Sequence, residues 1–262
     1  MAKFCALYSG SSGNCAVLSA GGISVLIDAG VSTLSIKKAL EAIDMRIEEI
    51  SAVLVTHEHS DHIKGLKTLL SKYKIPVYAS PGTIAGILET LPVDRELLKD
   101  LSPGSGAEIA GMYVSAFATS HDAKESMGFR IHTPDGRRVA IATDLGYISD
   151  EVMAGISDCE LVMIESNHDV GMLQNGRYPY FLKHRILSKT GHLSNADCAA
   201  ALPRLCTLGT KHFVLAHLSH DNNLPALALE TAVAEMKLSG ISGEDYHVEV
   251  APRGGPEHVI CL

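Results

Sequence analysis

Residues 56–62 read Thr-His-Glu-His-Ser-Asp-His, which gathers four candidate metal ligands, His57, His59, Asp61 and His62. Alternate residues of an extended segment point the same way, so the first two imidazoles can face one cation. The aspartate and the last histidine then lie at the start of a helix and can face a second cation. Imidazole and carboxylate ligands together favour zinc or manganese, with iron as a third candidate, over calcium. The alternative is a surface cluster of histidines without metal, which this specific motif disfavours.

The segments on either side of this motif predict a strand and a helix. Residues 52–55 form a short apolar run, typical of a buried strand, and residues 63–70 follow helical spacing. Further outward, residues 15–19 and 23–28 flank Gly21-Gly22, which indicates a β-hairpin. Further strands are predicted at residues 75–79, 112–118, 127–132, 139–143, 161–165, 213–216 and 248–250. Helices are predicted at 34–43, 180–188, 195–206 and 225–238, and another follows the strand at 75–79, with Pro81 in its first turn.

Strands and helices therefore mix along the whole chain, and no linker or low-complexity segment divides it. We expect an α/β fold with sheets inside and helices outside, formed as one domain by residues 1–262. A weak symmetry supports two related halves, because Ile27-Asp28-Ala29-Gly30 and Thr143-Asp144-Leu145-Gly146 each close a predicted strand.

The composition is that of a folded enzyme rather than a disordered chain, with 46% hydrophobic and 20% charged residues. The formal charge of −8 disfavours a nucleic-acid footprint over the whole surface, so a polyanion would be gripped locally or by metal. The six cysteines include no C-x-x-C pair, and no apolar run is long enough to span a membrane. The N-terminus lacks the basic-then-apolar order of a signal peptide. We therefore expect a cytoplasmic protein with reduced thiols and no membrane contact.

With these motifs in this order, the chain resembles the metallo-β-lactamase superfamily over nearly its full length. The resemblance implies an αββα four-layer sandwich that holds two divalent metal ions. One metal would take His57, His59 and His121, and the other would take Asp61, His62 and His217. Asp144 and a hydroxide would bridge the two, with catalytic roles for Asp61 and Asp144, and Asp28 would orient the ligand loop. The residues alone leave a loop histidine open for His121 and a helix cap open for Asp144.

Three features favour phosphodiesters as substrates. The first is the bridging aspartate, which nuclease branches of the superfamily share. The second is Gly191-His192-Leu193-Ser194-Asn195, which resembles the motif that holds the scissile phosphate, with His192 stabilising charge or protonating the leaving oxygen. Ser194 is a candidate phosphate contact there, and a helix N-cap is the alternative. The third is residues 165–169, where His168 is a candidate phosphate contact or extra ligand and an exposed loop histidine is the alternative.

A narrower set of stretches, at residues 9–14, 165–169, 191–195 and 217–219, is similar to the YycJ/WalJ-like proteins. That resemblance implies a 5′→3′ exonuclease with DNA as its substrate. Lys183, His184, Arg185 and Lys189 form the best local basic cluster for a phosphate track, and a solvated helix face is the alternative. The competing enzyme class is a small-molecule metallo-hydrolase, namely a cyclic phosphodiesterase, thioesterase or lactonase. The negative net charge favours that class somewhat.

Overall fold

The computed structural model describes residues 1–262, and its strands form two seven-stranded sheets. The first sheet has the order β14-β1-β2-β3-β4-β5-β6. Its strands are β1 Lys3–Tyr8, β2 Cys15–Ala20, β3 Ile23–Ile27, β4 Ile50–Leu54, β5 Val77–Ala79, β6 Leu98–Asp100 and β14 Ile260–Cys261. The second sheet has the order β13-β12-β11-β10-β9-β8-β7. Its strands are β7 Gly106–Ile109, β8 Met112–Ala118, β9 Met127–His132, β10 Arg138–Ala142, β11 Leu161–Glu165, β12 His212–Ala216 and β13 His247–Val250.

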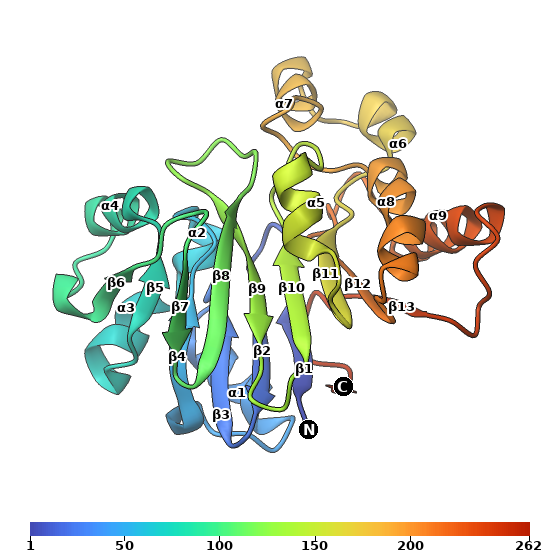
Figure 1. The fold of residues 1–262 in the computed structure, drawn as a ribbon. Coiled ribbons are helices and arrows are strands. Elements are labelled where there is room, and N and C mark those ends of the chain that lie inside the picture. The colour runs from blue at the N-terminus through green and yellow to red at the C-terminus, as the bar shows by residue number, and fades with distance from the viewer.

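Helices cover the outer faces of both sheets, so the molecule has the four layers of an αββα sandwich (Figure 1). The α-helices are α1 Thr33–Glu41, α2 Ser60–Ile63, α3 Leu66–Thr68, α4 Pro81–Thr90, α5 Asp150–Ile156, α6 Val170–Asn175, α7 Tyr180–Ile186, α8 Asn195–Thr207 and α9 Pro225–Leu238. None of them combines the length and the apolar content that crossing a bilayer requires. The α/β sandwich predicted from the sequence is confirmed.

The two halves of the chain repeat one pattern of strand pairing. In the first sheet β1, β2 and β3 pair antiparallel, and β3 to β6 then pair parallel. In the second sheet β7 to β10 pair antiparallel, and β10 to β13 pair parallel. The weak sequence symmetry around Asp28 and Asp144 therefore corresponds to equivalent places, because each residue follows the strand at which antiparallel pairing changes to parallel.

Alternate residues of the central strands enter two separate hydrophobic clusters. In β11, Leu161 and Met163 belong to the cluster that includes the inter-sheet core, whereas Val162 and Ile164 belong to the cluster under the outer helices. This division follows from the pleat, which points successive side chains to opposite faces. Because both faces are covered, the strand reads as a continuous apolar run, as parallel strands usually do.

Several predicted boundaries are corrected by the structure. The predicted strand at residues 52–55 is Ile50–Leu54, and the predicted helix at residues 63–70 is broken into α2, α3 and a π-helical turn over Leu69–Tyr73. The sequence reading missed β6, β7, β14, α5 and α6, all of seven residues or fewer. Such short elements carry too few turns of periodicity to be recognised. The hairpin turn at Gly21-Gly22 is confirmed, with φ of 61° and 81°.

Gly30 allows two distant loops to touch at the edge of the sandwich. A Cβ atom built on this residue would lie 1.6 Å from the carbonyl oxygen of Asp61, which is backbone and cannot move away easily. Its amide donates to the carbonyl of Asn14 at 2.8 Å, so the loops at residues 9–14, 28–31 and 56–62 pack together here. The missing side chain of Gly30 therefore helps to set the position of the ligand motif.

We predict that Gly30→Ala destabilises the fold by about 2 kcal/mol or more, because the added methyl group overpacks a backbone contact. The melting temperature should then fall by roughly 4 °C or more, as measured by circular dichroism. Gly243→Ala is the matched control, since a Cβ atom there meets nothing within 4 Å. Equal melting temperatures for the two variants would contradict this account of Gly30.

Candidate metal centre

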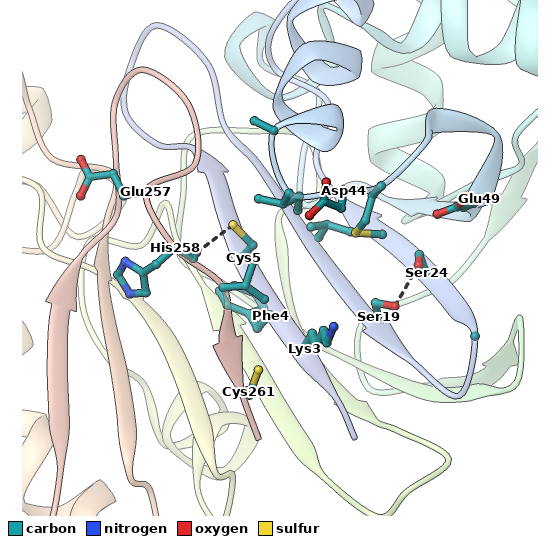
Figure 2. A pocket seen from close by; sticks show the side chains of 16 residues that line it. Lys3, Phe4, Cys5, Ser19, Ser24, Asp44, Glu49, Glu257, His258 and Cys261 are labelled. Carbon is teal, nitrogen blue, oxygen red and sulfur yellow. Dashed lines mark hydrogen bonds between the residues drawn. The ribbon is translucent and has the colours of Figure 1, made fainter.

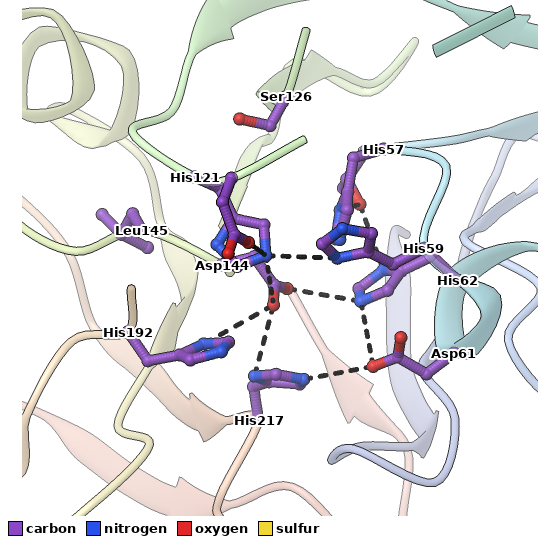
Figure 3. Close-up of polar contacts among 12 residues, drawn as sticks. His57, His59, Asp61, His62, His121, Ser126, Asp144, Leu145, His192 and His217 are labelled. Atoms are coloured by element: carbon purple, nitrogen blue, oxygen red, sulfur yellow. Dashed lines mark hydrogen bonds and ion pairs between the residues drawn. The ribbon is translucent and has the colours of Figure 1, made fainter. Parts of the chain in front are cut away.

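The predicted ligands all lie just beyond the carboxyl ends of strands, and these ends meet at one edge of the sandwich. His57 follows β4, His121 follows β8, Asp144 follows β10 and His217 follows β12. Figure 3 shows their side chains turned toward one another from separate elements. The structure thus brings together every residue that the sequence predicts as a metal ligand, although up to 160 positions separate them in the chain (217 − 57 = 160).

The first group contains His57, His59 and His121, whose potential ligand atoms lie within 4.8 Å of one another. His121 Nε2 is 3.3 Å from His59 Nδ1. The other nitrogen of His121 donates to the carbonyl oxygen of Gly191 at 3.1 Å. Because a carbonyl can only accept, this contact places the proton on Nδ1 and leaves the Nε2 lone pair facing the group.

The second group contains Asp61, His62 and His217, again with ligand atoms within 4.8 Å of one another. Asp61 Oδ2 is 3.6 Å from both His62 Nε2 and His217 Nε2. Asp144 lies between the two groups, with one carboxylate oxygen 3.4 Å from His62 Nε2 and the other 3.8 Å from His121 Nε2. The helix-cap alternative for Asp144 does not describe this position, since α5 begins at Asp150 with Ser149 as its cap.

The donor set fits a pair of cations. His57 Nε2, Asp144 Oδ2 and His217 Nε2 are buried and have no hydrogen-bond partner among the protein atoms. An unpartnered buried polar atom costs about 1–3 kcal/mol, so three of them in one small volume require an explanation. All three are of the nitrogen and oxygen types that zinc and manganese accept, and each points to the same space.

Asp28 fixes the orientation of the ligand motif from behind. Its Oδ2 lies 2.8 Å from His62 Nδ1, and its Oδ1 accepts from the backbone amide of Thr56 at 2.8 Å. The hydroxyl of Thr56 also contacts this carboxylate at 3.0 Å. Since the carboxylate holds the proton of His62 on Nδ1, the Nε2 lone pair faces the centre, where the side-chain amide of Asn14 lies 3.0 Å from it. This arrangement agrees with the orienting role predicted for Asp28.

Glu165 is a functional candidate that the sequence reading did not assign. It is fully buried at the end of β11, and its Oε1 accepts from Nδ1 of both His192 and His217 at 2.8 Å. Its Oε2 accepts from the backbone amides of Leu145 and Leu193 at 3.0 and 3.1 Å. An acidic residue that ends an apolar strand was a usable signal, because a buried carboxylate needs several donors.

The electrostatics of the centre divide the histidines into two kinds. Burial, followed by the neighbouring imidazoles, holds the pKa of His57 well below its usual value. Burial also disfavours the charged form of His62, but Asp28 and Asp144 outweigh it and raise that pKa to about 9. For His217, burial is likewise outweighed by Asp144, Asp61 and Glu165, which raise its pKa well above the usual value. Protons therefore compete with cations at His62 and His217.

Glu165 and Asp61 stay ionised despite their burial. Burial alone would raise the pKa of Glu165, but the imidazoles of His192 and His217 hold it well below the usual range. The pKa of Asp61 is depressed in the same way, because His217 and His62 outweigh burial. The centre therefore keeps its negative charge at neutral pH, which favours cations.

His192 lies at the margin of the cluster. Its side chain is 13% exposed, whereas those of His62, His121, Asp144 and His217 are 3% exposed or less. Its ring is 5.1 Å from that of His121 and 5.2 Å from that of His217, measured between centroids. With Nδ1 directed at Glu165, the remaining nitrogen is available to a substrate that approaches the centre.

The structure distinguishes between the alternatives that the sequence leaves open for Ser194 and His168. The Ser194 hydroxyl donates to Asp197 at 2.6 Å and accepts from the amide of the same residue, so it caps α8. The N-cap alternative therefore describes Ser194, and its hydroxyl is not free for phosphate. The exposed-loop alternative for His168 is wrong, because the residue is 1% exposed and both of its ring nitrogens lack a partner.

Three residues of the centre adopt a left-handed backbone conformation. Asp28, Asp144 and His217 have φ values of 59°, 56° and 56°. Residues other than glycine rarely adopt this conformation, which costs about 1 kcal/mol or more, and it concentrates at functional sites. The turn lets the chain leave its strand abruptly and aim the side chain along the sheet edge rather than across its face.

The basic cluster predicted at residues 183–189 is partly used within the fold. Arg185 forms an ion pair with Asp122 at 2.8 Å, and Lys183 donates to the carbonyl of Gln174 at 2.8 Å. Lys189 is exposed and makes no ion pair. Two of the four members of the predicted phosphate track therefore have internal partners, and the track itself stays a prediction.

A hollow of about 810 Å³ lies elsewhere, between the first sheet, the end of α1 and the C-terminal segment (Figure 2). It is lined by Lys3, Cys5, Met45 and Val259 among others, and the Cys5 thiol donates to the carbonyl of His258 at 3.1 Å. Burial and then Glu249 raise the pKa of this thiol to about 11, so it is not a thiolate nucleophile at neutral pH. This hollow is large, but its cysteine is not poised to act as a nucleophile, so we do not place the reactive site there.

Comparison with known proteins agrees with this geometry. The profile of the β-lactamase superfamily domain matches residues 24–218. The exodeoxyribonuclease YycJ of Bacillus anthracis is 40% identical over 94% of this chain and 93% of its own length. The exodeoxyribonuclease WalJ of Streptococcus pneumoniae is 36% identical over the same shares. Among solved structures, the metallo-β-lactamase fold protein YhfI from Bacillus subtilis superposes with a TM-score of 0.73 at 17% identity, over 99% of this chain and 98% of that one.

The likeness to the solved structure shows the fold alone, because only 17% of the residues are identical. The profile match and the two sequence relatives show the family to which the chain belongs. The chain belongs to the β-lactamase superfamily and, within it, to the family that contains the exodeoxyribonucleases YycJ and WalJ.

Proposed function

We propose that this chain is a metal-dependent phosphodiesterase that digests DNA as a 5′→3′ exonuclease. The observation that carries the proposal is the convergence of seven predicted ligands, three of whose buried atoms have no protein partner. The names of the two sequence relatives support DNA as the substrate. We also propose that residues 1–262 act as one domain, since the ligand set draws on loops of both sheets.

In this proposal, His57, His59 and His121 hold one divalent cation, and Asp61, His62 and His217 hold the other. Asp144, whose carboxylate lies between the two groups, would contribute to holding both cations. Zinc and manganese both suit these donors, and iron is a third candidate. When bound, such a cation pair activates water at neutral pH and neutralises charge that develops at phosphorus. His168 stays a predicted phosphate contact or extra ligand.

The residues of the chain supply orientation and proton transfer. Asp28 and the Gly191 carbonyl hold two imidazoles in the tautomer that presents Nε2. Glu165 holds His192 in the same way through Nδ1. We propose that Nε2 of His192 carries the proton that the leaving oxygen of the substrate takes up, because this side chain is 13% exposed and its other nitrogen is held by Glu165.

We predict that Asp144→Asn lowers DNA hydrolysis to the level of buffer and reduces bound metal. Asparagine keeps the shape and accepts the left-handed backbone at φ 56°, so the loss would come from the missing charge. Release of labelled nucleotide from duplex DNA and metal analysis of the dialysed protein would measure both effects. Asp44→Asn is the matched control, since Asp44 is an exposed residue with φ 57°. Full activity in Asp144→Asn would contradict the bridging role.

We predict that His192→Gln lowers kcat on DNA by about a hundredfold or more while the metal content stays the same, because a proton donor is lost and a ligand is not. Single-turnover kinetics and metal analysis would separate the two effects. His132→Gln, on β9, serves as the control. A parallel loss of metal and rate would mean that this imidazole acts in structure.

We predict that Mn²⁺ raises the melting temperature and that the increment grows with pH. The raised pKa values stabilise the metal-free fold at low pH, and for His62 this contribution is lost as pH rises through about 9. A cation binds only the deprotonated imidazoles, so the stabilisation from about 100 times Kd of metal, roughly 2.7 kcal/mol, should be smallest in acid and keep growing until the pH reaches the raised pKa of His62, about 9. Thermal scans with Mn²⁺ or EDTA would measure this, and an increment that grows as pH falls would contradict the ligand assignment.

Substrate class is tested by purified protein with Mn²⁺ or Zn²⁺ on three substrates. Bis-p-nitrophenyl phosphate reports phosphodiester chemistry, 5′-labelled duplex DNA reports exonuclease polarity, and a thioester reports the small-molecule alternative. Cleavage of the thioester without either phosphodiester would overturn the proposed function.

A further inference from the structure

The segment at residues 170–191, which we call the basic arm, differs in charge from the rest of the chain. It contains α6, α7 and the turns that join them, and Figure 1 places both helices at the end of the molecule where β8 turns into β9. The arm has four basic residues, Arg177, Lys183, Arg185 and Lys189, and no acidic residue. The chain as a whole carries −8, so the remainder carries −8 − 4 = −12.

The basic arm also exposes two adjacent aromatic side chains. Tyr180 is 79% exposed and Phe181 is 73% exposed, and they form the first turn of α7. The other four phenylalanines of the chain, Phe4, Phe117, Phe129 and Phe213, are buried, with exposures of 5% or less. Tyr113 and Tyr147 are also exposed, at 47% and 45%, but they stand at separate positions of the chain, so the adjacent pair of the arm is the aromatic surface that indicates contact with another molecule.

Contacts of its backbone and side chains fix the basic arm to the loops of the metal centre. The Ser120 hydroxyl donates to the Lys189 carbonyl at 2.6 Å, and Arg185 pairs with Asp122 at 2.8 Å, so both neighbours of His121 are tied to the arm. On the other side, the Tyr178 hydroxyl donates to Asp221 at 2.9 Å, in the loop that follows His217. The helix that carries the exposed aromatic side chains is therefore held by hydrogen bonds and an ion pair to the loops that contain His121 and His217.

The exposed basic residues of the arm indicate which kind of molecule binds beside its aromatic side chains. Arg177 and Lys189 are exposed and form no ion pair, so they are free to meet phosphates, whereas Lys183 and Arg185 hold the arm together. An apolar protein partner would gain nothing from this positive charge beside a negatively charged centre. A single strand of DNA offers both the phosphates for the basic residues and the flat bases for the aromatic rings.

We propose that the basic arm binds the unpaired end of the DNA strand that is being digested, with bases stacked on Tyr180 and Phe181 and phosphates beside Arg177 and Lys189. This inference rests on the proposed function. A terminal base that leaves the duplex loses its stacking partner, and an exposed aromatic ring replaces that partner without reading the sequence. Stacking here would keep the strand end apart from its complement while a phosphodiester lies at the metal centre.

The test compares the wild type with Tyr180→Ala/Phe181→Ala. The probe is a 5′-phosphorylated, phosphorothioate-linked oligothymidylate, which resists hydrolysis, and its binding to the Mn²⁺-loaded protein is followed by fluorescence anisotropy. We expect the double variant to raise Kd about tenfold through lost stacking. We also expect the ratio of kcat/KM on DNA to kcat/KM on bis-p-nitrophenyl phosphate to fall by a similar factor. Tyr113→Ala, which removes a half-exposed aromatic on β8, is the matched control.

Two further variants separate stacking from general apolar contact. Tyr180→Trp/Phe181→Trp should restore the affinity, whereas Tyr180→Leu/Phe181→Leu keeps apolar area without a π face and should stay weak. A 2-aminopurine at the 5′ end should be quenched by the wild type and not by the leucine variant. Unchanged Kd in the alanine variant, full affinity in the leucine variant, or no binding of the probe by the wild type would each overturn the inference. Binding without cleavage of any phosphodiester would overturn the proposed function and leave only the part of the inference that concerns binding of single-stranded DNA to the basic arm.

Discussion

The arrangement of the centre depends on carboxylates that are buried where the strands end. An ionised carboxylate out of water must be surrounded by donors, and here imidazole and backbone N–H groups supply them. Asp28 takes the proton-bearing nitrogen of His62, and Glu165 takes those of His192 and His217. Each of these contacts turns the opposite ring nitrogen toward one shared space. The imidazoles are thus oriented by acids on one side so that they can present lone pairs on the other.

Backbone conformation makes the same geometry possible. Asp28, Asp144 and His217 occupy the left-handed region directly after a strand, where most side chains would be strained. Gly30 removes a side chain where the peptide of Asp61 passes, so the ligand loop can approach the β3 turn closely. The energetic cost of these conformations is met by the two hydrophobic clusters, which hold the strands rigidly behind them.

Much of the site could be predicted from the sequence because its ligands follow recognisable strands in a recognisable order. The stretch at residues 56–62 and the three later ligands were found in this way. Glu165 was not assigned, because its partners lie 27 and 52 residues away and only the folded chain shows that they converge on one oxygen. For His168 the sequence leaves both alternatives open for a related reason: nothing local distinguishes a loop histidine that becomes buried from one that stays in solvent. Short helices and edge strands were missed because they contain too little periodicity.

The division of the chain into two similar halves has a consequence for biosynthesis. The half that leaves the ribosome first contributes His57, His59, Asp61 and His62, and the later half contributes His121, Asp144 and His217. Neither sheet by itself contains a full set of donors for a cation pair. A nascent chain would therefore be unable to assemble the bridged pair until β12 has been added to the second sheet. Metal capture would then follow the pairing of both sheets rather than initiate folding.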